Sequence, residues 1–156
     1  MRFLLYDRIL DLEPGKHILA VKMVTLADEF LGEHYPRRAI MPATLVLEAL
    51  AQVAGWLHLV TRGFNIRMVL ALVEGVTYGR PVVPGDELRL EAWTLYTHGG
   101  GVTARAEARV GGELVAAVER LVLAHEEAND DDYVAQQRER FRYVSGGYVL
   151  PEVDAR

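Results

Sequence analysis

One long apolar segment, Ala43 to Val60, most constrains what this chain can fold into. A helix that is apolar on every side either crosses a membrane or lies at the centre of a soluble core. Glu48, Gln52 and His58 interrupt the segment, and a lone membrane helix would have to bury these polar groups in lipid at high cost. We therefore expect the central helix of a core and no membrane span.

The composition fits one domain with an ordinary core. The chain has 156 residues, 51% of them hydrophobic and 25% charged, which is enough for a full core without metals. It has no cysteine, which excludes a disulfide scaffold and a cysteine nucleophile and fits a cytoplasmic location. The net charge of −5 argues against nucleic-acid binding. No two histidines have metal-ligand spacing, so we expect no zinc site.

Segments typical of β-strands surround the apolar helix, and Pro-Gly or Gly-Gly turns separate them. One strand alternates Arg105, Glu107 and Arg109 with small apolar residues, which indicates a sheet with one wet face. Pro42 is expected to begin the helix and Gly63 to follow its end, whereas residues 28–38 read as a loop. The predicted strands are residues 6–12, 17–24, 68–78, 87–96, 102–110 and 114–123. This order predicts an α+β fold, an antiparallel sheet of about six strands wrapped around one helix.

The C-terminal part has a different character. An acidic run at residues 126–132 precedes a predicted short helix from Tyr133 to Tyr143, with Asp131 or Asp132 as its cap. Residues from Ser145 onward look loosely ordered. We therefore divide the chain into a domain of residues 1–125 and an extension of residues 126–156. Ser145 is also the only serine, which argues against a serine hydrolase despite a His-Gly-Gly-Gly stretch at residues 98–101.

A cluster in residues 32–52 could carry acid–base chemistry. Glu48 stands alone in the apolar run, and a carboxyl group in such surroundings tends to hold its proton and act as a general acid. His34 can accept a proton near neutral pH. The first helical N–H groups, on Ala43 and Thr44, could hold a developing oxyanion. Less specific readings remain open at this point: a solvated His34, a Glu48 that reaches solvent, and a Gln52 that either orients Glu48 or caps a strand N–H.

Three motifs resemble one family. Residues 34–36 (His-Tyr-Pro), 41–42 (Met-Pro) and 48–52 (Glu-Ala-Leu-Ala-Gln) are similar to the signature of FabZ-type 3-hydroxyacyl-[acyl carrier protein] dehydratases. The likeness continues in residues 7–16 and in the strand-turn segment 79–86, and it covers about residues 6–125.

The resemblance implies a hotdog fold, a homodimer with active sites at the subunit interface, and in many members a hexamer. It implies that His34 acts on the α-proton, and that Glu48 of the partner chain acts on the β-hydroxyl that leaves as water. It further implies that the N–H of Ala43 polarises the thioester carbonyl and that the acyl chain lies in an apolar tunnel. The substrate would arrive on acyl carrier protein, with no metal or organic cofactor. Thr44, Gln52 and Tyr78 complete the residues expected to bind substrate.

The sequence departs from the family pattern at several glycines and one proline. Glu33, Arg37 and Ala43 stand at positions that are usually glycine, and Ala39 replaces a proline. Ala43 can still donate its N–H in a helical conformation, although its methyl group narrows the site. Arg37 and Arg38 could instead bind the acidic carrier protein or the phosphate of its prosthetic arm.

Other functions stay open on the sequence alone. A hotdog thioesterase, a dehydratase of an unusual secondary-lipid or polyketide-like chain, and a non-catalytic subunit that binds acyl carrier protein would each use similar motifs. The extension could be a solvated tail. It could also be a helix whose aromatic residues pack on a neighbouring subunit or partly cover the tunnel mouth.

Overall fold

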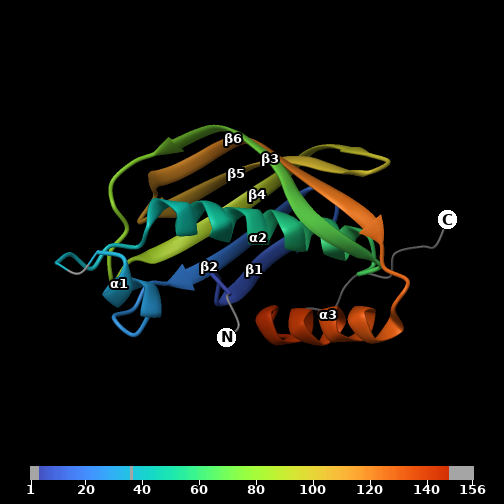
Figure 1. The fold of residues 1–156 in the computed structure, drawn as a ribbon, viewed down its shortest axis with the longest axis horizontal. Helices are drawn as coiled ribbons and strands as arrows, with labels where there is room; N and C mark the ends of the chain where they lie inside the picture. The colour runs from blue at the N-terminus through green and yellow to red at the C-terminus, as the bar shows by residue number, and fades with distance from the viewer. Residues whose placement is uncertain (1–3, 36, 148–156) are drawn as a thin grey trace.

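The computed structural model describes residues 4–35 and 37–147. Within these residues it consists of a sheet, a long helix packed on one face of that sheet, and two further helices (Figure 1). The elements in chain order are β1 (Arg8–Glu13), β2 (His17–Met23), α1 (Glu29–Glu33), α2 (Ala43–Thr61), β3 (Ile66–Tyr78), β4 (Glu87–His98), β5 (Gly101–Val110), β6 (Glu113–Glu127) and α3 (Asp131–Val144).

The six strands form one antiparallel sheet in the order β1-β2-β4-β5-β6-β3. Strand β3 follows α2 in the chain and pairs with β6, so it lies at the edge opposite β1. Helix α2 therefore crosses the sheet between the hairpin β1-β2 and the edge strand β3 (Figure 1). The α+β hotdog architecture predicted from the sequence is confirmed.

Helix α2 is the centre of the core. It begins after Pro42, and its buried side chains include Leu50, Val53 and Leu57, which pack among the inward-facing residues of the sheet. By length and composition α2 could cross a membrane, but here the sheet covers it and most of its residues are buried. Burial of an all-round apolar helix by a sheet is the main hydrophobic contribution to such a fold.

Helix α2 ends in a left-handed turn that leads directly into β3. Gly63 has a φ of +64° and donates its N–H to Val60, and the N–H of Phe64 reaches the carbonyl of Leu59 at 2.9 Å. These hydrogen bonds satisfy carbonyl groups in the last turn of the helix. Phe64 also has a positive φ, of 70°, which is unusual for a bulky residue, and its ring is fully buried.

The structure corrects two sequence predictions. Residues 28–38 were expected to be a loop, but Glu29–Glu33 forms the short helix α1, because Leu31 and Phe30 supply an apolar face that packs on the core. The cap of α3 is Asp130 rather than Asp131 or Asp132, since its side chain accepts a hydrogen bond from the Tyr133 N–H. All six predicted strands exist with ends shifted by at most two residues, except that β6 runs on to Glu127.

Helix α3 is packed on the domain and is not a solvated tail. The ring of Phe141 is buried, 5.8 Å from the Trp56 ring of α2 and 5.5 Å from Phe64. Gln137 and Val144 are also buried. The predicted loose ordering from Ser145 onward falls mostly on residues 148–156, outside the described residues, and the boundary at residue 125 remains a prediction.

His58 is a buried histidine near the C-terminal end of α2. Its Nε2 atom lies 3.0 Å from Nδ1 of His125 on β6, and its side chain is almost wholly covered. Burial above all, together with the nearby His125, Arg62 and His98, lowers the pKa of His58 to about 4. The folded protein therefore holds His58 neutral at pH values where an unfolded chain would protonate it.

This difference makes stability fall with acidification. Between pH 6.5 and pH 4 the unfolded chain binds a proton at His58 that the folded chain rejects, so the free energy of unfolding should decrease as pH falls, by on the order of 3 kcal/mol. Urea unfolding at pH 7.5 and pH 4.5 measures this loss in the wild type and in His58→Gln. The loss should be clearly smaller in the variant; equal losses in the two proteins would contradict the assignment to His58.

Candidate active site

Glu48 and Gln52 lie one turn apart on α2 and face a pocket of about 350 Å³. The Gln52 amide donates to the Glu48 carboxylate at 3.0 Å and accepts the N–H of Leu5 at 3.1 Å. Gln52 therefore orients Glu48, as one sequence reading proposed, and it also accepts a backbone N–H, although Leu5 lies before β1 and not in a strand. This double contact fixes the rotamer of Gln52 and, through it, one carboxylate oxygen of Glu48. Glu48 is half-buried in the single chain.

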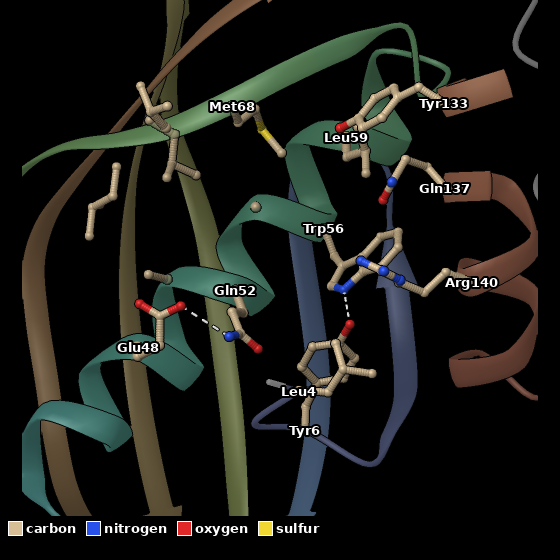
Figure 2. Close-up of a pocket in the computed structure, with 15 residues that line it drawn as sticks. Leu4, Tyr6, Glu48, Gln52, Trp56, Leu59, Met68, Tyr133, Gln137 and Arg140 are labelled. Carbon is tan, nitrogen blue, oxygen red and sulfur yellow. Dashed lines mark hydrogen bonds between the residues drawn. The ribbon is translucent and has the colours of Figure 1, made fainter. Parts of the chain in front are cut away.

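The pocket runs along α2 from Glu48 toward α3 (Figure 2). Figure 2 shows Glu48 and Gln52 at one end, and Tyr133, Gln137 and Arg140 of α3 at the other. Between these ends the walls are mainly apolar side chains from α2, β3, β6 and the segment before β1. They are Leu4, Ala51, Leu59, Met68, Val69, Leu70 and Leu123. An elongated apolar pocket with a carboxylate at one end can hold an acyl chain beside an acid–base group.

A second cleft of about 320 Å³ lies at the start of α2. Ala43, Tyr78 and Arg38 line it, together with Tyr35 and Met41. The N–H groups of Leu45 and Val46 both bond to the carbonyl of Pro42, whereas no residue that the structure describes accepts a hydrogen bond from the N–H of Ala43 or Thr44. The helix start thus keeps the two free donors that the sequence predicted, beside a cleft that a carbonyl group could enter.

His34 lies apart from Glu48 in a single chain. It follows the end of α1, is exposed, and packs edge-on against the ring of Tyr35 at 4.7 Å. His34 lines neither of the two cavities, and Arg37 is likewise exposed away from both. One chain therefore brings Glu48 together with Gln52, and Ala43 with Tyr78 and Arg38, but does not join His34 to Glu48.

A loop braced by an ion pair holds the start of α2. Arg80 forms a two-pronged contact with Asp86 at 2.8 and 3.1 Å, and Asp86 also accepts the N–H of Val83 at 2.9 Å. These hydrogen bonds, that from Arg80 first, hold the pKa of Asp86 below its usual range. The carbonyl of Val82 in turn accepts the N–H of Met41 at 2.9 Å, directly before Pro42. The segment 79–86 thus fixes where the helix begins.

Several pocket residues were not predicted from the sequence. Tyr6 and Trp56 are joined by a hydrogen bond from the indole N–H to the phenol oxygen, and both line the pocket. The sequence did offer Tyr133, Phe141 and Tyr143 of the extension as a possible cover of the tunnel mouth; in the structure Phe141 is buried and Tyr143 is exposed. Tyr133 lines the pocket, together with Gln137 and Arg140 of the same helix α3, which were not predicted. Their spacing of four and three residues places them on one helix face, a signal that the sequence did contain.

Comparisons with known proteins identify the family. Residues 1–119 match the family described as FabA-like domain. A FabZ 3-hydroxyacyl-[acyl-carrier-protein] dehydratase of Variovorax paradoxus is 40% identical over 116 residues, covering 72% of this chain and 77% of the relative. Proteins of the same name from Listeria monocytogenes and Syntrophotalea carbinolica are 39% and 41% identical; each alignment covers 75% of this chain and 82% or 81% of the relative.

This chain belongs to the FabZ-type dehydratase family. The resemblance read from residues 34–52 is thereby confirmed. Solved structures support the fold alone: a Streptococcus mutans protein bound to acetyl CoA has a TM-score of 0.62 at 14% identity, covering 79% of this chain and 90% of that chain. A hypothetical thioesterase with coenzyme A from Streptococcus pneumoniae also has a TM-score of 0.62, at 10% identity, covering 79% and 88%.

The bracing role of Asp86 can be tested directly. Asp86→Asn weakens the contact with Arg80, so we expect a loss of about 1–3 kcal/mol in the free energy of unfolding. We also expect faster amide hydrogen exchange at Met41, because its partner carbonyl is less firmly held. Glu87→Gln is the matched control, since Glu87 is exposed and contacts only Arg89 on the surface. Unchanged exchange at Met41 in Asp86→Asn would contradict the bracing role.

Proposed function

We propose that this protein dehydrates (3R)-hydroxyacyl-acyl carrier protein to trans-2-enoyl-acyl carrier protein in fatty acid or related lipid biosynthesis. The observation that carries the proposal is the Glu48 carboxylate, held by Gln52 at one end of an apolar pocket in a chain of the FabZ-type family. The absence of cysteine fits the cytoplasmic location that goes with this role.

In the proposed reaction His34 takes the α-proton and the electrons of that C–H bond form the double bond to the β-carbon. The C–O bond at the β-carbon breaks, and Glu48 of the partner subunit supplies the proton with which the hydroxyl leaves as water. The free N–H of Ala43, at the positive end of α2, polarises the thioester carbonyl and stabilises the enolate-like transition state. Proton transfer from the His34 imidazolium to Glu48, directly or through water, restores both groups.

A dimer follows from the separation of His34 and Glu48 and from the state of β3. One edge of β3 pairs with β6, and no strand among the described residues pairs with the other edge. Val69, Leu70 and Leu72 on this strand are exposed, Val69 by 66%. A bare apolar edge of this kind favours pairing with another strand, and a two-fold axis there would extend the sheet through both copies. We propose that this pairing brings each His34 to the Glu48 of the other copy, and that dimers can assemble into hexamers.

The carrier protein would approach the helix start. Arg38 is exposed and lines the cleft that Ala43 and Tyr78 also line, and its chain neighbour Arg37 is exposed outside the cleft. Guanidinium groups suit both an acidic protein surface and the phosphate of a prosthetic arm. In this proposal Thr44 adds a second helix-start donor, and Tyr78 lines the route by which the thioester enters.

The two halves of the site can be tested by mixing inactive variants. His34→Ala and Glu48→Gln should each lower dehydration of a 3-hydroxyacyl thioester by about 10²–10⁴-fold, since each removes one acid–base group. If the two residues act across an interface, a heterodimer of the variants has one intact site of two. Random exchange at equal amounts should then restore about a quarter of the wild-type rate.

The controls for this experiment are each variant unfolded and refolded alone, which should stay inactive. An absence of recovery in dimers shown by mass spectrometry to be mixed would place both residues in one chain. Full activity of Glu48→Gln alone would remove Glu48 from the mechanism. Release of free acid from a thioester lacking a β-hydroxyl, with no dehydration, would favour a thioesterase instead.

The edge of β3 gives a separate prediction. Leu72→Lys places a charge on the exposed part of this strand, so we expect dissociation to monomers and loss of dehydration together. Sedimentation velocity and turnover at the same protein concentration measure both. Leu26→Lys, on an exposed leucine in the loop before α1, should leave assembly unchanged. An active monomer in Leu72→Lys would refute the composite site.

A further inference from the structure

Helix α3 gives the pocket a polar far end that the family match does not cover. The FabA-like match ends at residue 119, and α3 begins at Asp131. Its side chains Tyr133, Gln137 and Arg140 nevertheless line the same pocket as Glu48 (Figure 2). The rings of Phe141, Trp56 and Phe64 pack together and hold α3 in this place. The part of the pocket farthest from the reacting end is therefore particular to this extension.

Gln137 is a buried polar group that faces the pocket. Its residue is only 7% exposed, and its amide makes no hydrogen bond with any residue in the described part of the chain. The small exposed part of Gln137 lies at the pocket, where water or a bound molecule can pair with the amide. Figure 2 shows the side chain reaching from α3 toward α2, into the region that a bound molecule would fill.

Arg140 adds a half-buried positive charge beside Gln137. Among residues 4–35 and 37–147 no carboxylate lies within ion-pair distance of its guanidinium group. The chain as a whole is acidic, with a net charge of −5. Arg140 differs from the other arginines without an ion pair because it is half-buried and lines the pocket. A guanidinium group without a carboxylate partner at the end of an apolar pocket can bind an anionic ligand, whose carboxylate would pair with it.

Tyr6 supplies a third donor at the same end. The indole N–H of Trp56 donates to the oxygen of Tyr6, so the hydroxyl proton of Tyr6 remains free for another acceptor. Burial raises the pKa of Tyr6, which keeps this hydroxyl protonated and able to donate at neutral pH. Gln137, Arg140 and Tyr6 thus offer hydrogen-bond donors around one end of the pocket.

The two ends of the pocket together indicate the shape of the ligand. Glu48 marks the end where the proposed chemistry occurs, and apolar residues such as Leu59 and Met68 line the length between. A plain alkyl chain that reached α3 would cover Arg140 and Gln137 without satisfying them, at a desolvation cost. A chain that ends in a carboxylate would cover the apolar walls and pair with Arg140.

We propose that the distal end of this pocket, formed by Gln137, Arg140 and Tyr6, binds a terminal carboxylate, so that the preferred substrates are 3-hydroxyacyl thioesters of dicarboxylic acids. This inference rests on the proposed dehydratase function, which it makes more specific. The selectivity arises from α3 and not from the acid–base residues at the other end.

The test compares two series of 3-hydroxyacyl thioesters of equal length, one ending in a methyl group and one in a carboxylate. We expect kcat/KM of the wild type to favour the carboxylate by about tenfold or more at the length that reaches α3, and Arg140→Met to reverse this preference. Gln137→Met should reduce it severalfold. Arg142→Met is the matched control, because Arg142 is an exposed arginine of α3 outside the pocket, and it should keep the wild-type ratio.

A second measurement does not depend on turnover. Suberate, an eight-carbon dicarboxylate, should bind the wild type and Arg142→Met in calorimetry, and Arg140→Met should bind it at least tenfold more weakly. A wild type that dehydrates both series with equal kcat/KM and does not bind suberate overturns the carboxylate site while dehydration stands. A wild type that binds suberate through Arg140 and turns over no hydroxyacyl thioester supports the site and refutes the proposed function.

Discussion

The structure depends on covering a helix that is apolar on every side. A sheet is a single layer, and it can bury only the part of α2 that faces it. The strands β2, β4 and β5 do this, and residues such as Leu50 and Val53 are sealed there. The remaining side of α2 needs other cover, and the structure meets this need with β3, the segment before β1 and α3. The pocket lies on this second side, where coverage is incomplete.

The candidate site uses the first two turns of α2. Near its start, the loop 79–86 fixes the position of Met41 and Pro42, and the first N–H groups of α2 stay without acceptors. One and a half turns further on, Glu48 is held by Gln52, which is itself anchored to the backbone of Leu5. A rigid helix thus carries free N–H groups and a carboxylate at a fixed spacing, which is what the proposed preorganised site requires.

The sequence predicted those parts of the fold that depend on local pattern. The apolar run after Pro42 marked α2, and the glycines at 99–101 and 111–112 marked the turns between β4, β5 and β6. The sequence offered the Glu48–Gln52 contact as one of two possible roles for Gln52, because residues four apart lie on the same helix face. Gln52 makes both contacts because the segment before β1 passes beside α2, which no local pattern indicates.

Long-range contacts explain what was missed. His58 and His125 are far apart in the sequence and meet only because β6 passes over the end of α2. Helix α1 is a single short turn whose stability comes from packing of Leu31 and not from its own sequence. Tyr133 and Arg140 lie on one face of a mostly polar helix, and only the docked position of Phe141 shows that this face closes a pocket.

The attachment of α3 has a structural consequence. It joins the domain after the last residue of β6, so no strand pairing or sheet register passes through it. Its anchor is a small aromatic cluster at the end of α2, in which Phe64 keeps an uncommon backbone conformation. A change in such a terminal appendage can therefore reshape the far end of the pocket while the strand pairing of the sheet stays the same.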